Sequence, residues 1–127
     1  MISAYFATLQ ATLDRYSLLY FVQDVRITFD KRPSEQGYVV GQVVFQDESE
    51  LHFREYLDAM GRTLSKLRYS YHYQSPQKEL LFRYDNARHK PPLNQLEHKH
   101  VGNEIKLVSE PTLDDVLLEI VTVNGWV

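Results

Sequence analysis

The sequence predicts an α+β domain, in which an N-terminal and a C-terminal helix accompany a mostly antiparallel sheet of five or six strands. Both ends of the chain carry apolar residues at three- and four-residue spacing, which is typical of amphipathic helices. The middle carries runs of alternating apolar and polar residues, which are typical of half-buried strands. Short turn-rich segments separate these runs, so neighbouring strands are expected to pair as antiparallel hairpins.

The length and composition favour one soluble domain over residues 1–127. Hydrophobic residues make up 43% of the chain and charged residues 24%, a balance typical of globular proteins and not of disordered ones. The absence of cysteine excludes disulfides, thiolate zinc sites and a cysteine nucleophile. No apolar run approaches the roughly 20 residues that span a bilayer, and no signal-peptide pattern opens the chain. We therefore expect a cytoplasmic protein that has no membrane partner.

The first helix is expected to begin at Ser3, whose side chain is a plausible N-cap. Phe6, Leu9, Leu13 and Tyr16 follow at helical spacing and form one apolar stripe. A stripe of this kind usually packs against a sheet.

Three strands are expected next, over residues 18–29, 38–46 and 50–57, with a turn-rich connection over 31–37. A three-residue loop of Asp47, Glu48 and Ser49 would place Val43 opposite Phe53. It would also place Phe45 opposite Leu51. The third strand would then show its polar face through His52, Arg54 and Tyr56.

The clearest hairpin joins residues 67–73 and 78–84 through a turn at 74–77. One register pairs Tyr71 with Leu80 and Tyr69 with Phe82, and it sets Arg68 across from Arg83. Like charges in that position are unfavourable unless an anion lies between them. A slip of two residues would set Arg68 against Asp85 as an ordinary ion pair, and both registers remain open. Tyr69, Tyr71 and Tyr73 could stack on nucleic-acid bases, but we expect them to be buried.

The chain is expected to leave the sheet over residues 85–92, to return as a possible edge strand over 105–108, and to end in a helix. Thr112 and Asp115 form a variant of the capping box at the start of that helix. Asn124 and Gly125 end it. Its predicted buried stripe consists of Leu113, Val116, Leu117 and Ile120.

The charges are unevenly placed along the chain. Residues 66–106 hold eight Lys or Arg and four Asp or Glu, whereas the protein has a net charge of −3. The segment that follows has four acidic and no basic residues. This pattern predicts one positive surface on an otherwise acidic body.

The same window contains side chains suited to cleaving a phosphodiester. The chain has no glycine-rich phosphate loop, no G-x-S-x-G elbow and no H-E-x-x-H motif. RNA cleavage without a metal needs a base, an acid and cations that hold the phosphate. The predicted catalytic residues are His72, Asp85, His98 and His100, and the predicted phosphate-binding residues are Arg54, Arg68, Arg83 and Lys99. Tyr84, Asn86 and His89 belong to the same chemical set, whereas His52 is interpreted as a surface or packing residue.

The segment His98-Lys99-His100 has two interpretations. In a strand, the two histidines would share one face and Lys99 would lie on the other, whereas in a loop all three could converge. The histidines could also bind a divalent metal with His72 and Asp85, or they could be solvated loop residues. The prediction assigns no metal ligand and no cofactor.

Four segments, residues 50–56, 68–73, 81–87 and 98–102, resemble the TumE family of toxins from type II toxin–antitoxin pairs. Residues 111–120 are also similar to the C-terminal end of that family. The resemblance extends from about Gly37 onward and departs from the family pattern at residues 90–96, which is why His89 receives no role. It implies a small cytoplasmic toxin that is bound and silenced by a helix-turn-helix antitoxin.

We therefore expect a toxin that acts on RNA as a metal-independent endoribonuclease. His98 or His100 would be the acid or base, Asp85 would orient a histidine, and Arg83 with Lys99 would hold the phosphate. His72, Arg83, Asp85 and residues 98–100 should then converge on one surface. Two alternatives remain: a non-catalytic module that binds RNA, a nucleotide or another anionic partner, and a metal-dependent nuclease or hydrolase.

Overall fold

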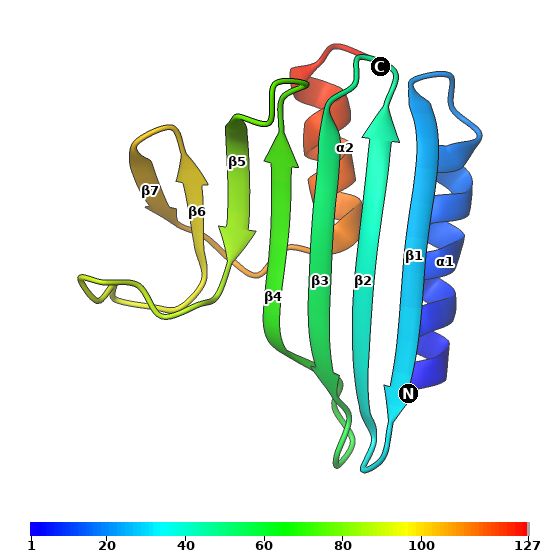
Figure 1. Cartoon of the computed structure of the whole chain (residues 1–127). Helices are drawn as coiled ribbons and strands as arrows, with labels where there is room; N and C mark the ends of the chain where they lie inside the picture. The colour runs from blue at the N-terminus through cyan, green and yellow to red at the C-terminus, as the bar shows by residue number, and fades with distance from the viewer. Residues whose placement is uncertain (127) are drawn as a thin grey trace.

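The computed structural model describes residues 1–126, which form one seven-stranded antiparallel sheet and two helices (Figure 1). The strands are hydrogen-bonded in chain order, each to the next. Their bounds are β1 Val22–Arg32, β2 Gln36–Phe45, β3 Glu50–Asp58, β4 Ser65–Gln74, β5 Leu80–Asp85, β6 His98–Val101 and β7 Glu104–Leu107. The helices are α1 Ile2–Ser17 and α2 Leu113–Val123, and neither is long and apolar enough to cross a membrane.

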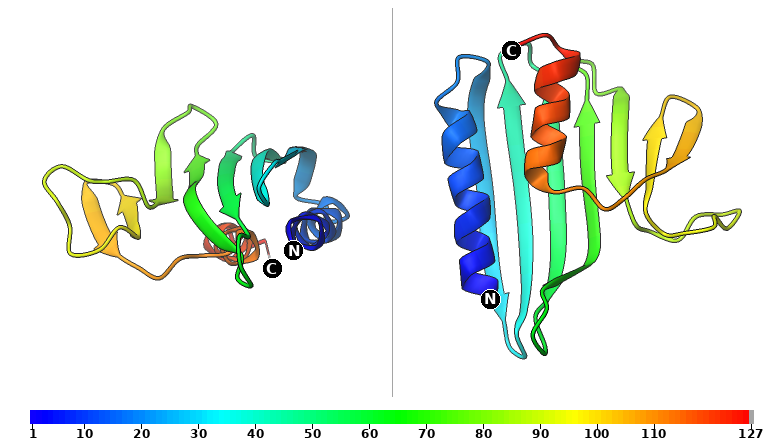
Figure 2. Two further views of the ribbon diagram at one scale, coloured as in Figure 1. Left: turned by 90° about the horizontal axis from the view of Figure 1, so that it is seen from below. Right: turned by 180° about the vertical axis from the view of Figure 1, so that it is seen from behind.

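Both helices lie on the same face of the sheet (Figure 2). Helix α1 runs along β1, and α2 lies behind the central strands, so β6 and β7 extend beyond the helical layer. We call the face covered by the helices the covered face and the opposite one the open face. Neither helix covers the open face, and most of its strand side chains are exposed or partly exposed.

The core lies between the helices and the covered face. Leu9 and Leu13 of α1 and Leu117 of α2 are buried against strand residues such as Val43 and Tyr71. The predicted burial of Tyr69, Tyr71 and Tyr73 is confirmed. Burial of these large apolar and aromatic side chains is the main force that holds the two layers together.

The predicted fold class is confirmed, and the sheet has one strand more than the upper predicted number. The additional strand is β6, which the sequence left open between a strand and a loop. It pairs with β7 through a tight turn in which Gly102 has φ 58°, a conformation that glycine adopts without strain. Residues 18–21, which were predicted as the start of the first strand, instead form the turn between α1 and β1.

The two helix ends gave opposite outcomes. The capping box of α2 is confirmed, because Thr112 accepts from the Asp115 amide and Asp115 accepts from the Thr112 amide. The prediction of Ser3 as the N-cap of α1 is wrong, because the helix already begins at Ile2 and Met1 makes no side-chain cap. Ile2 is fully buried, so packing fixes the start of this helix where a cap is lacking.

The predicted register of the β2–β3 hairpin is wrong by one pair. Val43 lies opposite Leu51 and Gly41 opposite Phe53. The loop consists of residues 46–48, because Glu48 adopts φ 70° and the Phe45 amide donates to the Ser49 carbonyl at 2.9 Å. The predicted faces are correct, because a shift of one full pair leaves every side chain on its own side.

Both predicted registers of the β4–β5 hairpin are wrong. Arg83 lies opposite His72 and Asp85 opposite Ser70, so Arg68 pairs with neither Arg83 nor Asp85. The turn is residues 76–78, with Lys78 at φ 67° and the Ser75 amide donating to the Glu79 carbonyl at 2.8 Å. A further irregularity lies between Tyr73 and Gln74.

Candidate functional site

The open face carries two rows of polar residues that run across the strands. The strand registers place His52, His72, Arg83 and His100 side by side in the first row. They place Arg54, Ser70, Asp85 and His98 side by side in the second row. Directly opposite residues in antiparallel strands have Cβ atoms about 4.5–5.5 Å apart, so each row is a line of neighbouring side chains.

Asp85 connects the two rows at their β5–β6 end. It is buried, and its Oδ2 accepts from Arg83 Nε at 3.0 Å. The His98 Nε2 lies 3.2 Å from Oδ1, and the His100 Nε2 lies 3.7 Å from Oδ2. The Ala87 amide also donates to Oδ1 at 2.9 Å. The predicted convergence of His72, Arg83, Asp85 and the two histidines of β6 on one face is therefore observed.

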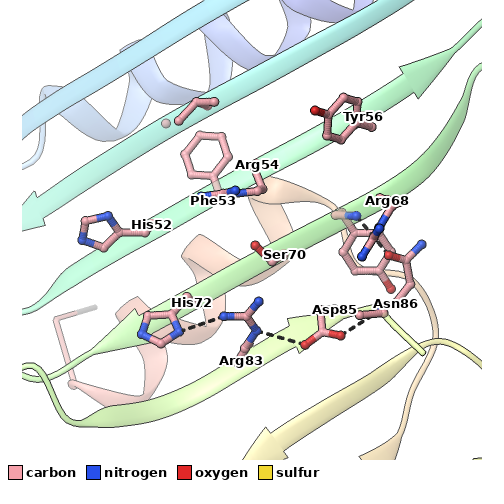
Figure 3. A pocket seen from close by; sticks show the side chains of 14 residues that line it. His52, Phe53, Arg54, Tyr56, Arg68, Ser70, His72, Arg83, Asp85 and Asn86 are labelled. Carbon is pink, nitrogen blue, oxygen red and sulfur yellow. Dashed lines mark hydrogen bonds and ion pairs between the residues drawn. The ribbon is translucent and has the colours of Figure 1, made fainter. Parts of the chain in front are cut away.

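Arg83 also reaches His72. Its Nη1 lies 3.4 Å from His72 Nδ1, and Figure 3 shows His72, Arg83 and Asp85 joined in one line. Burial, followed by the positive charge of Arg83, lowers the pKa of His72 below its usual range. Burial and the neighbouring His98 likewise lower the pKa of His100. His72 is therefore a neutral imidazole at neutral pH, the form that accepts a proton.

A groove with a volume of about 650 Å³ lies on the open face over β3, β4 and the end of β5 (Figure 3). Arg54, Arg68 and Arg83 contribute guanidinium groups to its walls, and Ser70 lies among them. Within residues 1–126, Arg54 and Arg68 form no ion pair, and both are exposed. Exposed arginines without a carboxylate partner around a hydroxyl group make a surface suited to phosphate groups.

His98 occupies a different environment from His72. It is only 2% exposed, and its Nδ1 lies 2.6 Å from the Leu96 carbonyl oxygen. A substrate on the open face cannot touch so buried a ring. His100 lies beside Arg83 on β6, one strand beyond those that line the groove.

Lys99 lies on the covered face, as expected for the middle residue of a strand. Its Nζ donates to Glu119 of α2 at 2.5 Å and lies 5.0 Å from the ring centroids of Phe82 and Tyr84. It therefore does not join Arg83 at one phosphate. The predicted single positive surface is likewise wrong as stated, because strand alternation divides the basic window between two faces. Lys66, for example, is buried beside Glu55 and Tyr71.

The sequence analysis missed His52. It lies directly opposite His72 in the first row, and its Nε2 is 2.9 Å from Glu50 Oε1. Alternation had placed His52, Arg54 and Tyr56 on one polar face, but only the β3–β4 register brings that face against His72. A second missed feature is the stack of Tyr38 on Tyr56, with ring centroids 4.3 Å apart, at the edge of the groove.

The only side chains in residues 1–126 with the grouping of a metal site are Asp85, His98 and His100. One ligand atom from each lies within 4.8 Å of the others. His72, which the sequence placed with them as a possible ligand, instead faces Arg83.

Comparison with family models found one match, to the family described as toxin TumE, over residues 9–126. Comparison with the curated proteins and with the solved structures found no significant match. The family match covers both helices and all seven strands, apart from the first residues of α1. The chain therefore belongs to the TumE family, the toxins of toxin–antitoxin pairs, and an antitoxin is its expected partner.

Proposed function

We propose that this toxin cleaves single-stranded RNA in the open-face groove without using a metal. The observation that carries the proposal is the contact of His72, whose pKa is lowered, with Arg83, beside Arg54 and Arg68, which have no carboxylate partner in the described part of the chain. A proton acceptor next to a cationic phosphate site is what transfer of the RNA 2′-hydroxyl proton requires.

The groove supplies one side chain for each role. The Nδ1 of His72, which faces Arg83 in the free protein, takes the proton of the 2′-hydroxyl as that oxygen attacks the phosphorus and the guanidinium of Arg83 turns to the phosphate. The bond from phosphorus to the 5′-oxygen breaks, and His52 gives that leaving oxygen a proton. Arg54, Arg68 and Arg83 neutralise the negative charge on the phosphate. The products are a 2′,3′-cyclic phosphate and a 5′-hydroxyl, so no water or cofactor enters this step.

The remaining predicted residues act indirectly in this proposal. Asp85 fixes the guanidinium of Arg83 through Nε, so its outer nitrogens, of which Nη1 also contacts His72, face the groove where phosphate would bind. His98 is a positioning residue, because its buried ring contacts Asp85 and not the groove. The roles that the sequence gave to His98 and Lys99 at the phosphate are therefore not retained.

The tyrosine stack supports RNA as the substrate. Tyr56 lines the groove and lies over Tyr38, and Arg32 lies 5.2 Å from the Tyr38 ring centroid and 5.6 Å from that of Tyr56. Partly exposed aromatic rings beside arginines are the usual platform for unstacked bases. The partner proposed for the groove is a helix-turn-helix antitoxin, which would silence the toxin by covering it.

The test is cleavage of an end-labelled single-stranded RNA by the purified full chain in EDTA. Wild type should cleave, and His72→Ala should lower the rate about 10²–10⁴-fold, because a positioned base is lost. Arg68→Ala should weaken RNA binding. Arg26→Ala is the matched control, because Arg26 lies on the same face outside the groove and pairs with Asp24.

Two results would replace the proposal. Binding of RNA without cleavage by folded wild type would identify a non-catalytic module. Cleavage that disappears in EDTA while circular dichroism shows an intact fold, and returns with a divalent ion, would identify a metal-dependent nuclease.

A further inference from the structure

At the end of the groove, Asp85 of β5 and the histidines of β6 converge with His89 of the loop over residues 86–97. We propose that Asp85, His98, His100 and His89 bind one zinc ion. This site shares Asp85 with the wall of the groove, but it contains none of the side chains that touch RNA in the proposed cleavage reaction.

The spacing of the donor atoms is already close to that of a tetrahedral site. Zinc binds imidazole nitrogen and carboxylate oxygen at about 2.0–2.2 Å, so two ligand atoms of one ion lie roughly 3.4 Å apart. His98 Nε2 lies 3.2 Å from Asp85 Oδ1, which matches this spacing. His100 Nε2 lies 3.7 Å from the other oxygen, Oδ2, so its ring has to turn toward Oδ1 to enclose an ion.

The hydrogen bond of His98 Nδ1 to the Leu96 carbonyl leaves Nε2 as the nitrogen that faces Asp85. Its Nδ1 lies 2.6 Å from the Leu96 carbonyl, and a carbonyl only accepts, so the ring proton is on Nδ1. Nε2 is then the nitrogen that faces Asp85 Oδ1, and either a proton or a metal ion lies between the two atoms. Two acceptors that face each other in a buried place require a positive centre between them.

A proton could bridge His98 and Asp85, but it would serve that pair alone. His100 Nε2, at 3.7 Å from the carboxylate, is too far for a hydrogen bond and yet faces the same group. Its ring centroid lies 4.8 Å from that of His98. Several nitrogen and oxygen ligand atoms that face one point are typical of a metal site.

His89 is the fourth residue of the proposed site. Its ring centroid lies 5.6 Å from that of His98 and 5.9 Å from that of His100, and its nitrogens lie outside the group of ligand atoms within 4.8 Å of one another, so the loop has to bring it closer. Its Nδ1 lies 2.9 Å from the Pro91 carbonyl, so Nε2 is the nitrogen that would bind the ion. A backbone carbonyl that holds the outer nitrogen of a histidine is the usual support of a metal ligand.

The charge and chemistry of the cluster favour zinc over magnesium or calcium. Imidazole is a preferred ligand of zinc, whereas the two harder ions take oxygen ligands. Arg83 pairs with Oδ2 of Asp85. The ion would therefore bind Oδ1, which accepts one hydrogen bond from the Ala87 amide and keeps its second lone pair. Bound zinc would link β5, β6 and the loop over residues 86–97, which lie beyond the helices.

Isothermal titration of the metal-free, untagged full chain with Zn²⁺ alone tests the proposal. Wild type should bind one ion per chain, and zinc should raise its melting temperature. His100→Ala and His89→Ala should weaken binding at least about tenfold and remove the thermal shift. His52→Ala is the control, because it removes a histidine of the same face outside the cluster.

The test is independent of RNA cleavage. Absence of binding to wild type would overturn the zinc site and assign the bridge between His98 and Asp85 to a proton. Equal loss of binding in His52→Ala would place the ion elsewhere. His89→Ala and His100→Ala alter partly exposed side chains, so both variants are expected to fold. A substitution of the buried His98 would be expected to unfold the protein.

Discussion

At the scale of single residues, the chemistry of the open face depends on the two contacts that the guanidinium of Arg83 makes, with Asp85 and with His72. Its Nε is fixed by Asp85, and its Nη1 reaches His72. The carboxylate orients the guanidinium, and the guanidinium in turn disfavours a second positive charge on the imidazole. Asp85 thereby orients the guanidinium whose charge helps to lower the pKa of His72.

This environment makes a pH-dependent prediction for stability. The pKa of His72 is lowered on folding, so just below pH 6.5 the unfolded chain binds a proton at this histidine more strongly than the folded chain does. The neutral form of His72 contributes fully to the free energy of unfolding above pH 6.5, the pKa of histidine in the unfolded chain. This contribution is lost as the pH falls from 6.5 toward the lower pKa of His72 in the folded protein. Wild type should therefore lose stability relative to His72→Gln as the pH falls through 6.5.

Urea denaturation of both proteins at several pH values measures this difference. A gap between the two unfolding free energies that stays constant across the range would contradict the lowered pKa. Comparing the two chains removes the titration of groups that they share.

At the scale of elements, one residue of α2 makes polar contacts with both β5 and β6. Glu119 accepts from Tyr84 of β5 at 2.6 Å and from Lys99 of β6 at 2.5 Å. Both charged side chains are largely shielded from solvent, with 16% of Lys99 and 25% of Glu119 exposed. Removing one partner of such a partly buried ion pair lowers the stability, because the other charge is left unpaired.

We expect Glu119→Gln to loosen β6 while the central strands stay intact. Amide exchange over residues 98–101 should become several-fold faster, because local opening of this edge would no longer break an ion pair. Hydrogen exchange followed by mass spectrometry measures it. Glu104→Gln is the control, since Glu104 is exposed and its nearest cation, Lys106, is 4.0 Å away. Unchanged exchange over 98–101 in Glu119→Gln would show that the contact does not hold the strand.

At the scale of the whole molecule, the two faces differ in what they offer a partner. The open face presents Arg54, Arg68 and Arg83, whereas the last helix begins with Asp114 and Asp115 and has no basic residue in its last turn. An antitoxin that blocks the groove would complement those arginines with acidic side chains.

We therefore predict that the antitoxin docks on the open face and buries Arg83 and His100. Association should slow as salt rises, because screening acts over about 8 Å at physiological ionic strength. Arg68→Glu should lower the association rate more than Arg26→Glu, which changes a residue on β1 away from the groove. Exchange mapping of the complex should protect β3 to β6. Protection confined to α1 and α2 would instead indicate an antitoxin that acts from the helical side.

The sequence by itself determined the local features of this protein. Helical spacing located the buried stripes of both helices, Thr112 and Asp115 fixed the start of α2, and alternation assigned the strand faces. These features depend on residues a few positions apart, where the periodicity of the backbone decides which side chains share a side.

Only the tertiary structure decided which residues meet across strands. The turns at Glu48 and Lys78, both at positive φ, set registers that the sequence pattern did not reveal. A register that moves by a full pair keeps every side chain on its face, so periodicity cannot detect the change. That freedom is why His52 was missed as the neighbour of His72, and why Asp85 could not be placed opposite His98 from the sequence.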